Sequence, residues 1–200
     1  MTANAAEWPI EWSGVTESLV TTLGPNERWN VAALGLHPPD EGRRAGVTEG
    51  AVTAETWGNT RTRRNFHRQG GGYVQFTRDP VAFTNAALSI YEVDAPVLDS
   101  ADAWVEVDVE LLDSNESDGT TVETWALTPV ESGVEREVVP TINRGFAAVV
   151  EATVAASRLD VDAYETETLR DRLDYFETVG RNCGGERVRA AFDRLHELLD

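Results

Sequence analysis

The chain has 200 residues, of which 41% are hydrophobic, enough for one ordinary domain with a small appendage and too many for a disordered protein. It holds 35 acidic and 17 basic residues, a formal net charge of −18 that argues against nucleic acid as a partner. The sequence shows neither a membrane-spanning apolar run nor a signal peptide, and its single Cys183 excludes an internal disulfide, so we expect a cytoplasmic protein with no membrane partner.

The N-terminal part of the chain predicts short strands. Runs of β-branched and apolar residues indicate strands over residues 16–23, 29–37, 46–56 and 73–77. Gly50 predicts a bulge or bend in the third of them.

Two short helices are predicted among these strands. Asn59 or Thr60 can cap a helix of about two turns that begins at Arg61 and stops at the glycines 70–72. The second helix covers residues 79–88, where an Asp-Pro pair makes a favourable helix start.

The clearest strand covers residues 104–111, where apolar and acidic side chains alternate. A polar loop is predicted over 113–120 and a returning strand over 121–130. Two short helices are too few to bridge parallel strands, so the pattern predicts an antiparallel β-barrel.

The C-terminal part predicts helices, over residues 143–159, 168–180 and 186–199. In the first of them only Glu151 is charged between Gly145 and Ser157, so this helix must be buried on several sides. We therefore predict an α+β protein, with a barrel over residues 1–138 and a small helical domain over 139–200.

One segment avoids negative charge. No acidic residue occurs from Thr56 to Arg78, where about four would be expected at the chain's average, and the segment carries five arginines: Arg61, Arg63, Arg64, Arg68 and Arg78. The start of the 61–69 helix is the best anion site in the chain, because a helix N-terminus offers free N–H groups and partial positive charge. The alternative is that Thr60 only caps the helix and the arginines balance nearby acids.

All 17 basic residues are arginine. A strongly acidic surface without lysine is typical of proteins that work in concentrated salt, where screening reduces self-repulsion. We interpret most of the net charge as an adaptation to such solvent.

Other candidate site residues carry weaker signals. Asn30 opens an apolar strand and could contact the polar edge of a planar ring, or could be a cap or turn residue bonded to backbone. Arg144 follows the helix cap Asn143, where a cation is favourable only if it faces an anion or a carboxylate. The three histidines show no ligand spacing, so we expect no metal site, and no nucleophile elbow or dinucleotide-binding glycine motif is present.

Three stretches give the chain a family resemblance: "TTLGPNERWNVAALGL", "GNTRTRRNF" and "PTINRGFAAVVEATVAASRL". With "DPVAFTNAAL" they resemble, in order, a family of archaeal proteins of unassigned function with an FMN-binding split barrel, related to flavin reductases. The third stretch is the most specific. The chain departs from the family pattern at Ala33, Phe66 and the pair Arg63-Arg64, none of which removes a phosphate donor.

The resemblance implies a flavin site and a pair of chains. It implies that Asn30, Val31 and Ala32 run beside the flavin. It also implies that the flavin phosphate is surrounded by Thr60, Arg61, Thr62 and Asn65. Asn143 and Arg144 would approach the site from the helical domain. The flavin would lie at the interface of a homodimer, which would also bury the apolar helix.

Three functions follow from this reading. The first is an FMN-dependent oxidoreductase of unknown substrate, in which no acid–base residue is obvious. The second is a module that holds FMN or another phosphorylated ligand without turnover. The third, an adaptor without a small ligand, leaves the acid-free segment unexplained.

Overall fold

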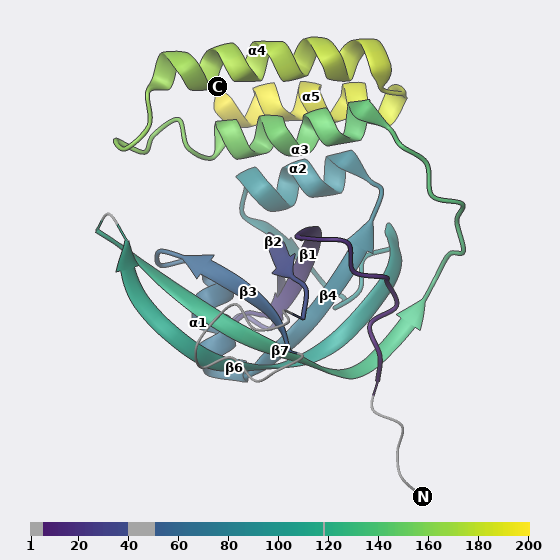
Figure 1. Cartoon of the computed structure of the whole chain (residues 1–200), viewed down its shortest axis with the longest axis vertical. Helices are drawn as coiled ribbons and strands as arrows, with labels where there is room; N and C mark the ends of the chain where they lie inside the picture. The colour runs from purple at the N-terminus through teal and green to yellow at the C-terminus, as the bar shows by residue number, and fades with distance from the viewer. Residues whose placement is uncertain (1–5, 40–50, 118) are drawn as a thin grey trace, which may run out of the picture. The chain divides into compact units, whose positions relative to one another are not determined.

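Six strands pair into a closed ring in this computed structural model, which describes residues 6–39, 51–117 and 119–200. The ring follows the order β1-β4-β6-β7-β3-β2 and closes through β1–β2, and its pairings are antiparallel, which confirms the predicted barrel (Figure 1). A short seventh strand, β5, lies beside β2. The strands are β1 (Thr16–Leu23), β2 (Trp29–His37), β3 (Val52–Trp57), β4 (Gly71–Thr77), β5 (Tyr91–Val93), β6 (Ala101–Ser117) and β7 (Thr120–Val134).

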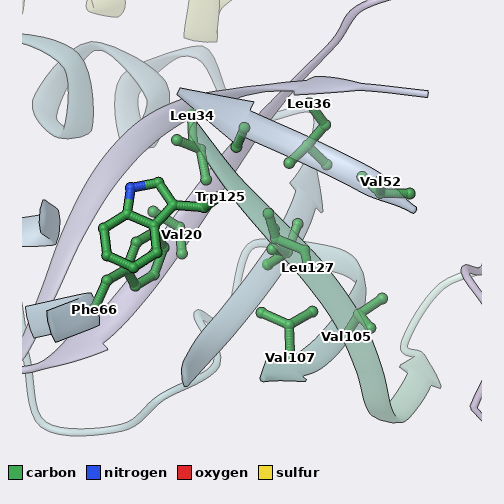
Figure 2. Packing of buried hydrophobic residues seen from close by; sticks show 11 residues of the cluster. Val20, Leu34, Leu36, Val52, Phe66, Val105, Val107, Trp125 and Leu127 are labelled. Carbon is green, nitrogen blue, oxygen red and sulfur yellow. The ribbon is translucent and has the colours of Figure 1, made fainter. Parts of the chain in front are cut away.

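The barrel interior is filled by alternate side chains of the strands. In β6, Val105 and Val107 are fully buried, while the acidic residues between and after them point outward. Figure 2 shows these valines among the core residues of neighbouring strands, with Phe66 of helix α1 (Arg61–Gln69) beside Trp125 of β7. Their rings meet edge to face with centroids 5.2 Å apart, so α1 is anchored to the core by its own aromatic side chain.

Most strand predictions agree with the structure, and two differ. The polar loop predicted over 113–120 is wrong, because β6 and β7 continue as a paired hairpin as far as Ser117 and Thr120. The short strand β5 was not predicted. The bend predicted at Gly50, with the first half of the 46–56 strand, lies outside the described residues.

A second unit consists of helices. It contains Arg78–Tyr91 as well as the chain from Val138 onward, whereas the division predicted after residue 138 assigns the first of these segments to the barrel. That segment carries α2, which packs against α3 and α5. The helices are α2 (Pro80–Leu88), α3 (Arg144–Ala156), α4 (Thr166–Cys183) and α5 (Glu186–Leu199).

The apolar helix α3 is buried within its own unit. It packs against α2, α4 and α5, and Ala148, Val149 and Ala152 are buried there. Its composition is therefore explained by contacts inside one chain and does not by itself require a second copy. Among the described residues, no helix is both long and apolar enough to cross a membrane.

Candidate anion site at the start of helix α1

Helix α1 begins as the sequence predicts. Thr60 has an extended backbone, and its hydroxyl accepts a hydrogen bond from the N–H of Arg63 at 3.2 Å. The N–H groups of Arg61 and Thr62, which precede this bond, have no acceptor among the described residues. With no acidic residue in the first turn, this end of α1 can bind an anion through backbone donors.

The arginines of α1 donate hydrogen bonds to other groups of the protein. Arg61 donates to Glu92 of β5 at 2.5 Å, and Arg63 donates to Glu123 of β7 at 2.7 Å. Arg64 donates to the backbone and side-chain oxygens of Asn59. The alternative that these arginines balance acids from elsewhere in the chain therefore holds for Arg61 and Arg63.

Glu92 is held by donors from the turn between β1 and β2. The side-chain amide of Asn26 lies 3.3 Å from both carboxylate oxygens, and Nε of Arg28 lies 4.0 Å from one of them. Arg28 also pairs with Asp94 at 2.9 Å. The result is a cluster of three donors, from the turn and from α1, around one carboxylate that is 21% exposed.

On the other flank of α1, Glu123 is buried at the end of the barrel. Its side chain points to the same face of β7 as the core residue Trp125, and it accepts hydrogen bonds from Arg63 and from Nε2 of His67 at 2.8 Å. The hydrogen bond from Arg63 lowers the pKa of Glu123, against the opposing effect of burial. This carboxylate is therefore ionised at neutral pH and fixes α1 to β7.

Asn65 connects α1 to β1. Its amide nitrogen donates to the hydroxyl of Thr22 at 2.9 Å, and its oxygen accepts from Arg68 at 2.8 Å. Arg68 also donates to the carbonyl of Leu23. Both polar ends of Asn65 are thus occupied, so its first role is to position the helix.

Asn30 lies next to this connection. It is directly opposite Thr22 in the β1–β2 pairing and is only 5% exposed, yet its side chain has no hydrogen-bond partner among the described residues. Thr62, in the first turn of α1, is equally buried, and its hydroxyl likewise has no partner within those ranges. Thr53 and Thr124, both 7% exposed, also lack a side-chain partner in these ranges, but Thr62 belongs to α1 and Asn30 pairs with Thr22, to which Asn65 of α1 donates. Buried polar groups of this kind must be satisfied by a ligand or by solvent.

The polar atoms of Asn30 and Thr62 are not fully enclosed. The Nε of Arg63 is the only unpaired side-chain polar atom in the described residues that is completely enclosed. The polar atoms of Asn30 and Thr62 therefore retain accessible surface. Next to Asn30, Val31 is buried on the opposite face of β2, while Ala32 shares the face of Asn30 and is partly buried against the core.

The two predicted site residues from the helical part lie in the helical unit. The side chain of Asn143 caps α3 by accepting hydrogen bonds from the N–H groups of Gly145 and Phe146, as predicted. Arg144 is exposed in the first turn and lines a groove of about 160 Å³ between α3 and α4. Arg144 makes neither a hydrogen bond nor an ion pair with a carboxylate among the described residues.

The acidic partners of α1 were missed by the sequence reading. Glu92 and Glu123 lie 31 and 60 residues from the arginines that they bind, and nothing in their local sequence marks them. For Glu123, one signal was available, since an acid in the apolar-facing register of a strand is unusual. The described residues contain no cluster of three or more potential metal ligands.

Models of a family described as a protein of unknown function (DUF447) match most of the chain. The N-terminal model covers residues 16–136 and the C-terminal model covers residues 143–197. The chain belongs to this family. The interval between the two matches falls where the barrel ends and the last three helices begin.

A solved structure shares the fold of this DUF447 protein. An FMN-bound member of the family from Methanosarcina mazei has a TM-score of 0.73 and 22% identity over 94% of this chain and 96% of its own. Lower similarity is found to a flavoredoxin from Methanosarcina acetivorans (TM-score 0.42, 12% identity, 68% and 79% covered) and an FMN-binding protein from Thermus thermophilus (0.40, 16%, 68% and 82%). The predicted class, a split barrel of the FMN-binding type followed by helices, is confirmed by the first of these.

Proposed function

We propose that this protein binds FMN, with the phosphate at the start of α1 and the ring beside the first residues of β2. The observation that carries this proposal is the pair of buried polar side chains that have no partner in the described residues: Thr62 in the first turn of α1, beside its free N–H groups, and Asn30 opposite Thr22, which Asn65 of α1 contacts. Neutral hydroxyl, amide and backbone donors beside Arg61 suit a phosphate with a charge of about −2. The FMN-bound relative from M. mazei supports the choice of ligand.

Different residues at the start of α1 would have different roles in binding the phosphate. Thr62 and the backbone of the first turn would donate to the phosphate, and Arg61 would balance its charge. Thr60 and Asn65 are occupied by the cap and by Thr22, so they would act by holding the helix in place.

The start of β2 would meet the ring of the ligand. Asn30 would satisfy a polar edge, while Val31 and Ala32 would supply backbone and apolar surface beside it. Bound flavin would supply the redox chemistry, since it accepts and donates hydride without help from an acid–base side chain. We accordingly assign no catalytic side chain.

We propose turnover, as an oxidoreductase of unknown substrate, ahead of a role as a non-catalytic FMN holder. We also propose that the chain pairs with a second copy, and that Asn143 and Arg144 approach the flavin from a helical unit. The exposure of Arg144 and its lack of an acidic partner in the described ranges favour this last role.

The test is the visible absorption spectrum of the purified protein, before and after FMN is added. We expect a yellow protein, or one that becomes yellow with one FMN per chain. Reduced nicotinamide is then added without oxygen: bleaching supports an oxidoreductase, and persistent colour supports the holder. A colourless protein that takes up no FMN would contradict both.

A further inference from the structure

We infer that Glu92 is a competing anion, which occupies Arg61 until a phosphate ester displaces it and thereby sets affinity and selectivity at the start of α1. The inference rests on the proposed function, because the phosphate in question is that of the proposed ligand. It assigns a role to a residue outside the acid-free segment that the sequence did not single out.

The first argument is the set of contacts around the Glu92 carboxylate. Arg61, Asn26 and Arg28 surround it with donors, the geometry of a small anion site in which a side chain of the protein is the anion. A phosphate ester that reaches Arg61 must therefore take the guanidinium from a group of the same sign.

The second argument is the difference between the two flanks of α1. The Arg63–Glu123 pair is held by His67 as well, and the side chain of Glu123 is 4% exposed, so this pair is fixed. The side chain of Arg61 is 41% exposed and that of Glu92 is 21% exposed. An ion pair this open to solvent contributes little, so Arg61 is the cation that can change its partner.

The third argument concerns charge. A phosphate with a charge near −2 attracts a guanidinium more strongly than a carboxylate does, so it displaces Glu92 from Arg61. Glu92 keeps Asn26 and Arg28 as partners after the exchange, so releasing Arg61 strands no buried charge. The carboxylate still repels the incoming phosphate, and a neutral ligand gains nothing from the exchange. Glu92 thus tunes binding of phosphorylated ligands alone.

The experiment compares FMN with riboflavin, which lacks the phosphate, by titrating each against the full-length protein and following flavin fluorescence. The variant Glu92→Gln keeps the shape of the side chain and removes its charge. We expect it to bind FMN about fivefold more tightly than the wild type in roughly 0.1 M salt, with riboflavin binding unchanged. The matched control is Asp94→Asn, which removes the same charge two residues away from a side chain that pairs with Arg28 and is 88% exposed. It should change neither affinity by more than about twofold.

A double-mutant cycle tests whether the effect passes through Arg61. In an Arg61→Gln background, Glu92→Gln should lose most of its effect on FMN affinity. Unchanged or weaker FMN binding by Glu92→Gln, an equal gain for riboflavin, or an undiminished effect without Arg61 would each overturn the inference while leaving FMN binding intact. If no variant and no wild-type sample binds FMN, the proposed function itself fails. Circular dichroism of each variant confirms that it is folded.

Discussion

Glu123 is one of the residues that fix the placement of α1. Its side chain is 4% exposed, and its carboxylate accepts hydrogen bonds from Arg63 and His67 of the helix. The Nε of Arg63 is enclosed and has no acceptor among the described residues. A neutral side chain at this position would leave the Arg63 guanidinium next to the core without its counter-charge. Removing one partner of such a pair is more damaging than the pair is stabilising.

We therefore expect Glu123→Gln to lower the free energy of unfolding at pH 7 by about 1–3 kcal/mol, below the value for a fully buried pair because the Arg63 side chain is 24% exposed. Urea denaturation followed by tryptophan fluorescence measures this. The control is Glu110→Gln, an exposed acid on β6, for which no loss is expected.

The same residue should shape the acid side of the stability curve. Because the pKa of Glu123 is lowered in the folded protein, its contribution is present above the unfolded pKa of a glutamate, about 4.3, and is lost as pH falls through the lower folded value. The difference in unfolding free energy between wild type and Glu123→Gln should thus shrink below about pH 4. A difference that stays constant down to pH 3 would show that the charge of Glu123 is not what stabilises α1.

At this scale the sequence predicted the cap, the start and the end of α1, because these depend on neighbours within four residues. Asp79 and Asn143 were predicted as caps and cap their helices, and of the two candidates Asn59 and Thr60 it is Thr60 that caps α1. The partners Glu92 and Glu123 could not be predicted, because only the closed barrel brings them to α1. The acid-free segment was visible in the sequence. The sequence did not show whether its arginines bind a ligand or acidic residues of the same chain.

Among the elements, α4 and α5 are in contact at a glycine. Gly180 is buried in α4, and a Cβ built there would lie 2.0 Å from Cε2 of Phe192, itself 1% exposed on α5. In an open helix, replacing glycine by alanine would gain about 1 kcal/mol. Here the added methyl group collides with a side chain that has no room to move.

Gly180→Ala should therefore destabilise the protein by about 1–3 kcal/mol, against the sign that helix propensity predicts. Thermal or urea unfolding of the two proteins decides the sign. The control is Gly185→Ala at the start of α5, where an added Cβ meets nothing within 4 Å and only a few tenths of a kcal/mol are expected from the changed cap. A gain in stability for Gly180→Ala would mean that the α4–α5 contact is looser than described.

The hairpin of β6 and β7 shows where element prediction from sequence stopped. Residues 113–117 are polar and exposed on both faces, so no alternation marks them as a strand. They are extended because a partner strand provides their hydrogen bonds, with Ser117 opposite Thr120. The strands β1 and β2 were predicted to the residue, because their β-branched and apolar residues form strand-length runs that end at turn residues; in β1 five consecutive residues are buried.

The whole molecule carries a net charge of −18 and has arginine as its only basic residue. Repulsion among so many carboxylates opposes folding at low ionic strength, and the Debye length falls from about 10 Å at 0.1 M salt to about 3 Å at 1 M. The proposed contact of a phosphate with Arg61 is an attraction between partly exposed charges, which the same screening weakens. Folding and FMN binding should therefore respond to salt with opposite signs.

We expect that raising KCl from about 0.1 M to 1 M stabilises the fold by at least 1 kcal/mol, roughly 2–4 °C in Tm for a chain of this size, while FMN affinity falls severalfold. Thermal unfolding without FMN and FMN titration at each salt concentration measure the two responses. Sucrose is the control, because it favours the folded state without screening charge and should leave FMN affinity unchanged. If FMN affinity rises with KCl as well, as it would if salt acted only by strengthening apolar burial, then an ionic contact to the phosphate does not control binding. If stability does not rise, repulsion among the surface carboxylates does not limit folding.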